Sequence, residues 1–392
     1  MRTLPEVLAS LYERLSPQTR HRVEFTGLHR WAMALLRERG VPVRLDIARS
    51  RTLFNRSWVS VGRATALDSL DLHPDYWHEE ILQVVKGRGL TEHAQYSDLR
   101  RVGRRTPLQS VHRDAVWELH TAYDVALREE GVHDPADVLS LALAEVRREP
   151  LGDRYRSVVV DEVQDLTLVG VQLLHALVGD RPDGLLLIGD GQQAVYPGGF
   201  TLSEAGIVVP GARSTVLRSN YRNAAEVIDA AAAVLGSDDY EDLGDTPSSG
   251  GAVEIVRRGG LAVRVAAADD ASLESSLVSD LREFADTGGR LGDCAVLTVT
   301  ASQAARWRGA LNRQGIAVLD LEDYRGATCD RVKVGTIKRA KGLEFARVHL
   351  PLEGSATSGD DERSVLARRE LYVGITRARD AVWIGEVASP SR

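Results

Sequence analysis

The stretch Ser157–Asp165 reads Ser-Val-Val-Val-Asp-Glu-Val-Gln-Asp and joins an apolar run to an acidic pair. Three β-branched residues in succession favour a buried strand of a parallel sheet. Asp161 and Glu162 then follow the carboxyl end of that strand, where open α/β sheets bind their ligands. One carboxylate could hold Mg²⁺, a hard cation that prefers oxygen ligands, and the other could orient or deprotonate a water. The alternative is a strand that only leads into a charged loop.

The composition limits the class of protein. The chain has 392 residues, of which 43% are hydrophobic and 27% charged, so we expect two or three globular units with their own cores. A net charge of -7 excludes a uniformly basic coat for nucleic acid, but it leaves room for a local basic groove. Cys294 and Cys329 are too few for a disulfide framework or a zinc site, and a cytoplasmic location fits them. We expect no signal peptide and no membrane span.

The chain changes character along its length. Residues 1–20 have the apolar spacing of a helix, and residues 45–150 are arginine-rich and mostly helical in pattern. From Arg156 onward, apolar strand candidates alternate with helix candidates as far as the strand predicted at Ala381–Gly385. Such alternation predicts parallel sheets.

Two further features could bind a ligand. His29 lies at a turn that opens a helix, where a helix cap is the equally plausible role. Arginines are concentrated between positions 100 and 113, and a solvated face is the usual explanation for such a cluster. A surface that binds nucleic-acid phosphates is the more specific interpretation. The clustered residues are Arg100, Arg101, Arg104, Arg105 and Arg113.

Four more motifs follow the first one in chain order. They are Gly-Asp-Gly-Gln-Gln-Ala-Val-Tyr (189–196), Asn-Tyr-Arg (220–222), Thr-Ile-Lys-Arg-Ala-Lys-Gly-Leu-Glu-Phe (336–345) and Tyr-Val-Gly-Ile-Thr-Arg-Ala-Arg (372–379). In this order, the five motifs resemble the superfamily 1 DNA helicases of the UvrD/Rep type. The resemblance covers about residues 157–385, and Thr-Gly-Leu-His (26–29) extends it to nearly the whole chain.

The resemblance implies an α/β fold with two RecA-like parallel-sheet lobes. The first lobe would be incomplete and would be made of residues 1–45 and 151–213. A helical, DNA-contacting subdomain would be inserted in it as residues 46–150. The second lobe would be made of residues 214–392, with too few residues between Asn223 and Thr336 for the large helical insertion of bigger family members.

The resemblance also implies ATP hydrolysis with Mg²⁺, coupled to 3′-to-5′ movement on single-stranded DNA in repair or recombination. Asp161 would hold Mg²⁺, and Glu162 would position or activate the attacking water. The other implied ATP-site residues are Gln193, which senses the γ-phosphate, Tyr221, which stacks on the adenine, Arg222 and Arg377, which reach the γ-phosphate, and Glu344, which binds the ribose. Phosphoryl transfer needs such positive charge around the equatorial oxygens.

Contacts with DNA follow from the same resemblance and from the basic cluster. The expected DNA-binding residues are His29, Phe200, Thr336, Lys338, Arg104 and Arg105. Two of them depart from the family pattern. Lys338 stands where the family usually has a histidine, and Phe200 would supply the base-stacking aromatic that the family carries slightly earlier.

The largest departure is the absence of the dipeptide Gly-Lys from the whole sequence. The family's phosphate-binding loop, Gly-x-x-x-x-Gly-Lys-Thr/Ser, depends on that lysine. We therefore expect an N-terminally truncated helicase, inactive on its own, whose phosphate loop belongs to a missing or separately encoded segment. The alternative is a non-hydrolysing module with a helicase fold that binds DNA or a partner.

Overall fold

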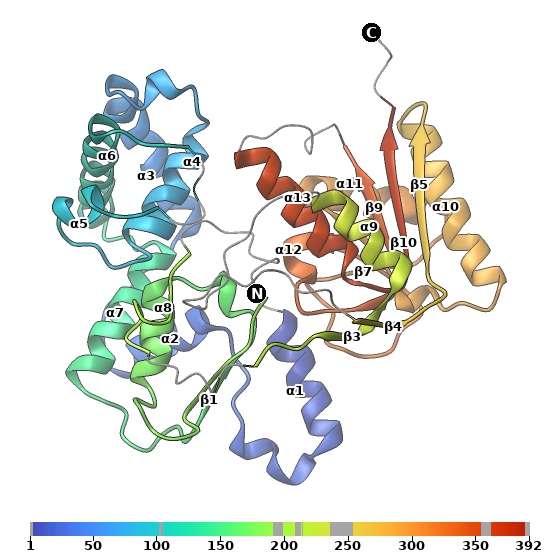
Figure 1. Ribbon diagram of the computed structural model, residues 1–392, viewed down its shortest axis with the longest axis horizontal. Helices are drawn as coiled ribbons and strands as arrows, with labels where there is room; N and C mark the ends of the chain where they lie inside the picture. The colour runs from blue at the N-terminus through green and yellow to red at the C-terminus, as the bar shows by residue number, and fades with distance from the viewer. Residues whose placement is uncertain are drawn as a thin grey trace. The chain divides into compact units, whose positions relative to one another are not determined.

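The computed structural model describes residues 3–101, 104, 106–190, 199–207, 213, 215–235, 254–353 and 362–388. They form two units, both visible in Figure 1. The described residues between 28 and 213 form the helix-rich unit. Residues 3–27 and the described residues from 215 onward form the six-strand unit. Within these residues, no helix combines the length and apolar character needed to cross a membrane.

The six-strand unit alternates strands with helices along the chain. Its elements are α1 (Thr3–Leu15), β3 (Ser219–Ala224), α9 (Ala225–Leu235), β4 (Glu254–Arg257), β5 (Leu261–Ala267), α10 (Asp270–Asp286), β6 (Cys294–Thr298), α11 (Ala301–Arg313), β7 (Val318–Asp320), β8 (Val332–Thr336), α12 (Ile337–Ala340), β9 (Phe345–Leu352), α13 (Glu362–Ile375) and β10 (Ala378–Val387).

All strand pairs of this unit are parallel. The main sheet has the order β5-β10-β9-β6-β8-β7, and β3 and β4 form a separate pair. In the centre of the main sheet, Val348 of β9 is in register with Val382 of β10 and with Ala295 of β6. The helices between successive strands are what allow parallel pairing, and the parallel α/β architecture expected from the sequence is confirmed.

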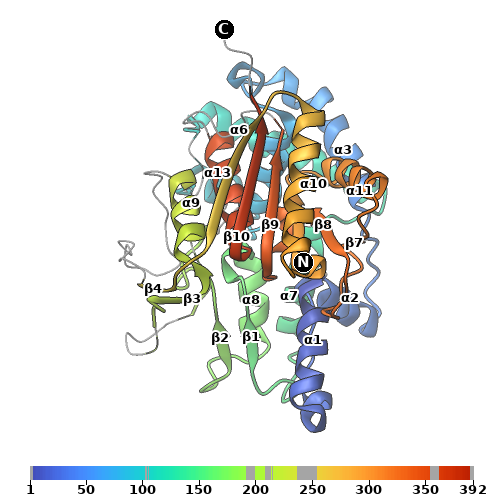
Figure 2. The same cartoon turned by 90° about the vertical axis from the view of Figure 1, so that its right-hand side faces the viewer.

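Helices cover both faces of the main sheet, as Figure 2 shows. His349 and Trp383 point to one face, with ring centroids 5.9 Å apart, and His349 Nε2 lies 2.7 Å from Asp280 Oδ2 of α10. Because successive side chains of a strand alternate between faces, Leu350 points to the other face, where it lies against Gly374 of α13. The central strands are therefore buried on both sides, as parallel sheets require.

Helix α1 packs on the six-strand unit through its first turns. The Thr3 hydroxyl donates a hydrogen bond to the carbonyl oxygen of Leu321 at 3.1 Å. Leu4 is buried and lies over Gly342, which has a φ of +75°. A side chain at Gly342 would clash with Leu4, so glycine permits both the left-handed backbone and the close approach.

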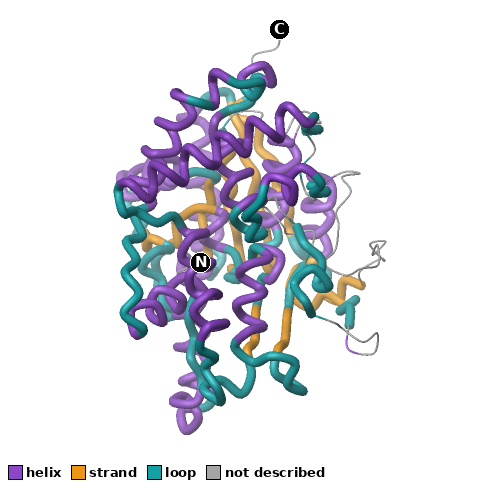
Figure 3. Tube along the Cα trace, turned by 90° about the vertical axis from the view of Figure 1, so that its left-hand side faces the viewer, coloured by secondary structure: helices purple, strands orange, loops and turns teal. Residues whose placement is uncertain are grey.

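The helix-rich unit contains the elements from α2 to β2, and Figure 3 shows its helices in purple. They are α2 (Leu28–Glu38), α3 (Ile47–Ser60), α4 (Pro74–Glu79), the π-helical turn Glu80–Val85, α5 (His93–Ser97), α6 (Ser110–Glu129), α7 (Pro135–Arg148), β1 (Val158–Val160), α8 (Leu168–Ala176) and β2 (Leu185–Leu187).

Two cores divide this unit. Helices α3 to α6 share one core, built around large side chains such as Phe54, Trp77 and Tyr123. Helices α2, α7 and α8 share another, in which Trp31 and Leu139 are buried. The sequence placed α7 in the inserted helical part, 46–150, and residues 1–45 in the first lobe. In the structure, α7 instead packs against α2 and α8. Residues 3–27 belong to the six-strand unit.

Strands β1 and β2 form a parallel pair, with Val158 opposite Leu185 and Val160 opposite Leu187. This confirms the predicted parallel strand at the valine run. The expectation of full burial was wrong, because Val159 is 66% exposed. Val160 is 7% exposed on the other face, where α8 and Phe200 cover the strand.

Candidate nucleotide and DNA site

The acidic pair lies at a sharp turn directly after β1. Asp161 is exposed, and its Oδ1 accepts a hydrogen bond from the backbone N–H of Glu162 at 2.9 Å. Glu162 has a φ of +56°, in the left-handed region that non-glycine residues rarely adopt. Such strained backbone is concentrated at functional sites, and here it directs two adjacent carboxylates away from the end of the strand.

Gln164 holds this turn and has no role in the sequence-based prediction. Its side chain is buried, and its Nε2 donates a hydrogen bond to Glu162 Oε2 at 2.6 Å. Its Oε1 accepts a hydrogen bond from the N–H of Asp190, which follows β2, at 3.2 Å. One amide thus fixes the Glu162 carboxylate relative to the ends of both strands. The sequence offered one signal for this role: Gln164 is a polar residue inside the stretch Ser157–Asp165, and its side chain is buried in the structure.

The exposed carboxylate of Asp161 fits a divalent cation such as Mg²⁺, which takes hard oxygen ligands. Among the described residues there is no group of three or more His, Cys, Asp or Glu side chains that could hold a metal ion. Mg²⁺ is usually bound by one or two carboxylates together with substrate phosphates. Asp161 therefore suits a cation that arrives with a nucleotide.

The six-strand unit brings together residues from three separate motifs. Tyr221 and Arg222 lie on β3, and Tyr221 is 71% exposed. Arg222 Nε lies 3.1 Å from Oε2 of Glu344, the residue directly before β9. Both charged side chains are about half exposed, so this ion pair contributes little stability and can exchange for a ligand.

Arg377 lies next to this group but is buried. Its Nε donates a hydrogen bond to the carbonyl oxygen of Val373 at 3.0 Å, and its Nη2 donates one to Thr376 Oγ1 at 3.2 Å. The backbone N–H of Phe345, which follows Glu344, donates a hydrogen bond to the Arg377 carbonyl oxygen at 2.9 Å. To reach a phosphate, the Arg377 guanidinium would have to leave these acceptors, so its catalytic role stays a prediction.

We expect Tyr221→Ala to change the free energy of unfolding by less than about 0.5 kcal/mol, because the exposed ring has few contacts to lose. If the ring stacks on adenine, the same change lowers ATP affinity by about tenfold. Tyr221→Phe keeps the ring and serves as the control. Urea unfolding and fluorescent-nucleotide binding measure the two effects. An unchanged affinity in Tyr221→Ala would remove the ring from the site.

The predicted DNA contacts lie on both units. His29 is exposed on the first turn of α2 in the helix-rich unit. In the six-strand unit, Thr336 Oγ1 accepts a hydrogen bond from the N–H of Arg339 at 3.3 Å. Lys338 is exposed, with its Nζ 3.9 Å from Glu370 Oε2. Burial raises the pKa of Glu370, and the charges of Lys338 and Lys341 only partly oppose that rise.

Three arginines of the basic cluster, Arg101, Arg104 and Arg113, are buried or half-buried, whereas Arg100 is exposed. The Arg104 side chain is fully buried, with its Nε 2.9 Å from Glu80 Oε2 and its guanidinium 4.2 Å from the centre of the Tyr76 ring. Arg101 also pairs with Glu80. Arg113 Nη1 donates to three backbone carbonyls at 2.7–3.0 Å. These arginines stabilise the helical core, and the prediction that Arg104 contacts a phosphate was wrong, because its side chain is fully buried.

Phe200 is also placed differently from its predicted role. It is 4% exposed and belongs to the core cluster that includes Val160 and Leu168. A ring packed in this way is not available to stack on a base. Gln193 and Arg105 lie outside the described residues, so their predicted roles stay predictions.

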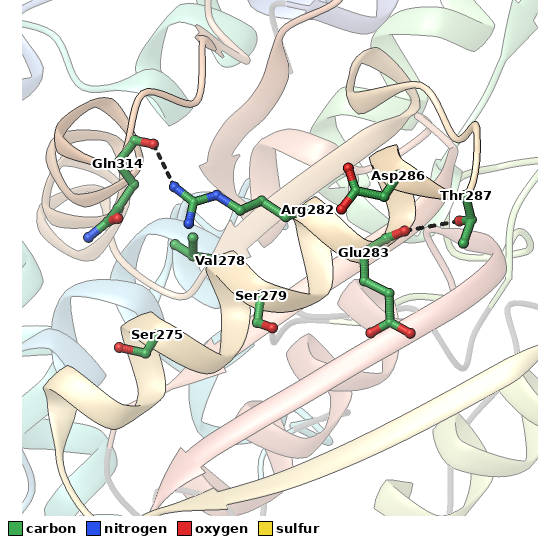
Figure 4. Close-up of a pocket in the computed structure, with 8 residues that line it drawn as sticks. All are labelled: Ser275, Val278, Ser279, Arg282, Glu283, Asp286, Thr287 and Gln314. Atoms are coloured by element: carbon green, nitrogen blue, oxygen red, sulfur yellow. Dashed lines mark hydrogen bonds between the residues drawn. The ribbon is translucent and has the colours of Figure 1, made fainter.

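A cavity of about 430 Å³ lies on the outer side of α10 near the end of α11 (Figure 4). Arg282 crosses it, and its Nη2 donates a hydrogen bond to the carbonyl oxygen of Gln314 at 3.0 Å. Thr287 Oγ1 donates one to the Glu283 carbonyl oxygen at 3.0 Å. None of the predicted site residues lines this cavity.

Parallel sheets with an acidic pair after one strand and arginines near others are typical of proteins that transfer phosphoryl groups. Residues 17–207 match the UvrD/REP helicase N-terminal domain, and residues 332–384 match the UvrD-like helicase C-terminal domain. The chain therefore belongs to the UvrD/Rep-type helicases.

Curated relatives agree with this assignment. The ATP-dependent DNA helicase UvrD2 of Mycobacterium tuberculosis is 31% identical over 34% of this chain and 20% of its own length. DNA helicase II of Escherichia coli is 24% identical over 49% of this chain and 27% of its own length. The chain thus spans about a fifth to about a quarter of these relatives.

A solved structure also matches part of the chain. It is the C-terminal domain of a possible DNA helicase from Lactobacillus plantarum, 17% identical over 44% of this chain and 91% of its own. The TM-score is 0.31, which is too low to establish a shared fold.

Proposed function

We propose that this chain forms part of a motor that hydrolyses ATP with Mg²⁺ and moves 3′ to 5′ on single-stranded DNA, in cytoplasmic repair or recombination. One observation carries the proposal. Arg222, Glu344 and Arg377 come from three distant motifs, yet an ion pair and a backbone hydrogen bond join their segments beside the exposed Tyr221 ring. Residues gathered for stability alone would not need an exposed aromatic ring in their midst.

The six-strand unit would bind the nucleotide. The exposed Tyr221 ring offers a flat surface for adenine, and Glu344 offers acceptors for the ribose hydroxyls. Arg222 and Arg377 would supply positive charge to the γ-phosphate, where negative charge is spread over three oxygens in the transition state. Because Glu344 already pairs with Arg222, nucleotide binding would exchange that ion pair for a phosphate contact.

The helix-rich unit would supply the hydrolytic groups. Asp161 would hold Mg²⁺, which bridges phosphate oxygens and neutralises their charge. Glu162 would orient the attacking water or accept its proton, with its carboxylate fixed by Gln164 at 2.6 Å. Gln193 would sense the γ-phosphate. Phosphoryl transfer needs mainly this kind of positioning and charge.

His29, Thr336 and Lys338 would contact single-stranded DNA. Contacts between lysine and phosphates release counterions, so the affinity for DNA would fall as salt is raised.

The test measures ATP hydrolysis by the purified chain with and without single-stranded DNA, and strand displacement on duplexes with a 3′ or a 5′ tail. Because the sequence lacks Gly-Lys, we expect the chain on its own to hydrolyse little ATP. The hydrolysis that remains should depend on DNA, and displacement should occur only from the 3′ tail. DNA-independent hydrolysis, or displacement from a 5′ tail, would overturn the proposal.

A second candidate is a non-hydrolysing module that binds DNA or a protein partner. The absence of Gly-Lys from the sequence favours it, because the lysine of the phosphate loop is the usual contact to the β- and γ-phosphates. The same assay separates the two. Salt-sensitive DNA binding without any DNA-stimulated hydrolysis would select the module.

A further inference from the structure

The side chain of Asn223 is buried between β3 and the start of β10. It is 4% exposed, and its Nδ2 donates hydrogen bonds to the carbonyl oxygens of Thr376, at 2.9 Å, and Ala378, at 2.6 Å. These two carbonyls flank Arg377. Both amide protons of one side chain are therefore used to hold the backbone on either side of a predicted catalytic arginine.

A second asparagine fixes the turn that carries Arg222. Asn220 Oδ1 accepts hydrogen bonds from the N–H groups of Arg222, at 2.9 Å, and of Asn223, at 3.0 Å. Asn220 Nδ2 donates to Asn223 Oδ1 at 3.1 Å. The two amides thus determine the path of the backbone through Arg222, and the Asn223 amide bonds to both the β3 turn and the segment around Arg377.

The third segment of the site joins the same junction. The N–H of Phe345 donates to the carbonyl oxygen of Arg377 at 2.9 Å, and Glu344, one residue earlier, pairs with Arg222. The amino end of β10 lies beside β3 (Figure 2). The segments around Arg222, Glu344 and Arg377 are therefore each joined to the other two. The hydrogen bonds of Asn223 join the Arg222 segment to the Arg377 segment.

We propose that Asn223 is a positioning residue that holds Arg222 and Arg377 in register for the γ-phosphate of ATP. It does not touch the nucleotide itself, and it acts through the backbone of the two arginine segments. The inference rests on the proposed function. Beyond that function, the inference states that the Asn223 amide is needed to recognise the γ-phosphate of ATP but not the adenine or the ribose.

The test compares the affinities of the full chain for fluorescent ATP and ADP analogues with Mg²⁺. We expect Asn223→Ala to lower the affinity for ATP by about tenfold and the affinity for ADP by less than about threefold. Asn223→Asp keeps the side-chain volume but loses both donated hydrogen bonds, so we expect the same selective loss. Asn312→Ala removes an exposed asparagine of α11 and serves as the control.

A merely structural role would lower both affinities together, or only the melting temperature, and either result would overturn the inference. A variant that lacks both arginines gives a further check. Because Asn223 acts through Arg222 and Arg377, adding Asn223→Ala to the Arg222→Ala, Arg377→Ala variant should reduce ATP affinity by less than about threefold more. Two full, additive losses would contradict the positioning role.

The same measurements distinguish a failure of the proposed function from a failure of the positioning role alone. If the wild-type chain binds ATP no better than ADP, or binds neither, then Arg222 does not serve a γ-phosphate, and the role of Asn223 fails with it. If Arg222→Ala removes the preference for ATP but Asn223→Ala and Asn223→Asp leave it intact, the function stands and only the positioning role is wrong.

Discussion

Replacing Glu80 with glutamine should lower the free energy of unfolding by about 3–5 kcal/mol, because it leaves buried arginines without their anion. Glu80 is fully buried, and its Oε1 accepts hydrogen bonds from Arg101 Nε and from the Tyr96 hydroxyl, both at 2.7 Å. Its Oε2 lies 2.9 Å from Arg104 Nε. Urea unfolding followed by tryptophan fluorescence measures the loss, since Trp77 is buried in the same core.

The neighbouring residue offers a matched control. Glu79 has a side chain that is 45% exposed and lies 3.9 Å from Arg104 Nη1. We expect Glu79→Gln to cost less than about 1 kcal/mol, as for other exposed ion pairs. A loss of similar size in Glu79→Gln and Glu80→Gln would show that the buried network does not carry the stability of the helical core.

Low pH should lower the free energy of unfolding, partly because Glu80 becomes protonated. Burial raises the pKa of Glu80, but the hydrogen bond and charge of Arg101 and the charge of Arg104 outweigh it, so its folded pKa is below the ordinary value. The unfolded chain therefore binds the proton more readily. The stability that Glu80 contributes is complete above the unfolded pKa of about 4.3 and is lost as the pH falls through the lower folded pKa.

Unfolding measured from neutral pH downward should therefore show a steeper loss for the wild type than for Glu80→Gln below about pH 4. Other carboxylates, including Asp280 beside His349 and Arg347, also have a lowered pKa, although burial alone would raise it. Their contribution is common to both proteins, so the difference between the two curves isolates Glu80. Parallel curves would contradict the assignment.

Strands with continuous apolar runs were predictable from the sequence. The strand predicted at Ala381–Gly385 lies within β10, which is paired between β5 and β9. Strand β5 (Leu261–Ala267) was missed because its alternating, partly exposed pattern lies at the sheet edge. Among the described strands, β5 pairs with β10, which is far away in the chain, so nothing local to the sequence marks the pairing.

The errors on Arg104 and Phe200 have one physical cause. A count of arginines indicates local charge, but whether that charge faces water depends on Glu80, which packing brings to it from a preceding turn. Phe200 follows two glycines in the sequence, a pattern that predicts an exposed loop, yet the ring belongs to the core cluster that includes Val160 of β1. Burial of both residues is decided by contacts between elements, which local patterns do not encode.

Part of the candidate site was predictable and part was not. The motifs marked Arg222 and Glu344 as functional, and the structure places them 3.1 Å apart. The sequence did not indicate a role for Gln164 or Asn223. An asparagine or glutamine that bonds to backbone groups has no characteristic spacing in the sequence. Their roles follow only from burial and from the atoms that they bridge.

Glu162→Gln should lower the DNA-stimulated rate of ATP hydrolysis by about 10²–10⁴-fold, because an amide cannot accept the proton of the attacking water. The fold should be unaffected. The glutamine oxygen can still accept the hydrogen bond from Gln164 Nε2, which is 2.6 Å from the carboxylate in the native chain. Glutamine also has the same size, so the left-handed turn at φ +56° should persist.

A measurement of ATP affinity shows whether Glu162→Gln impairs the activation of water or the binding of the nucleotide. Glu162 is proposed to act on the attacking water and not on adenine or ribose, so the affinity for ATP should change by less than about threefold. Glu149→Gln, at an exposed carboxylate after α7, is the matched control and should keep the full rate. Because the water is activated only in the transition state, the change should appear in kcat and not in KM. A rise in KM with unchanged kcat would instead assign Glu162 to nucleotide or metal binding, and Asp161 would then be the residue to test as the base.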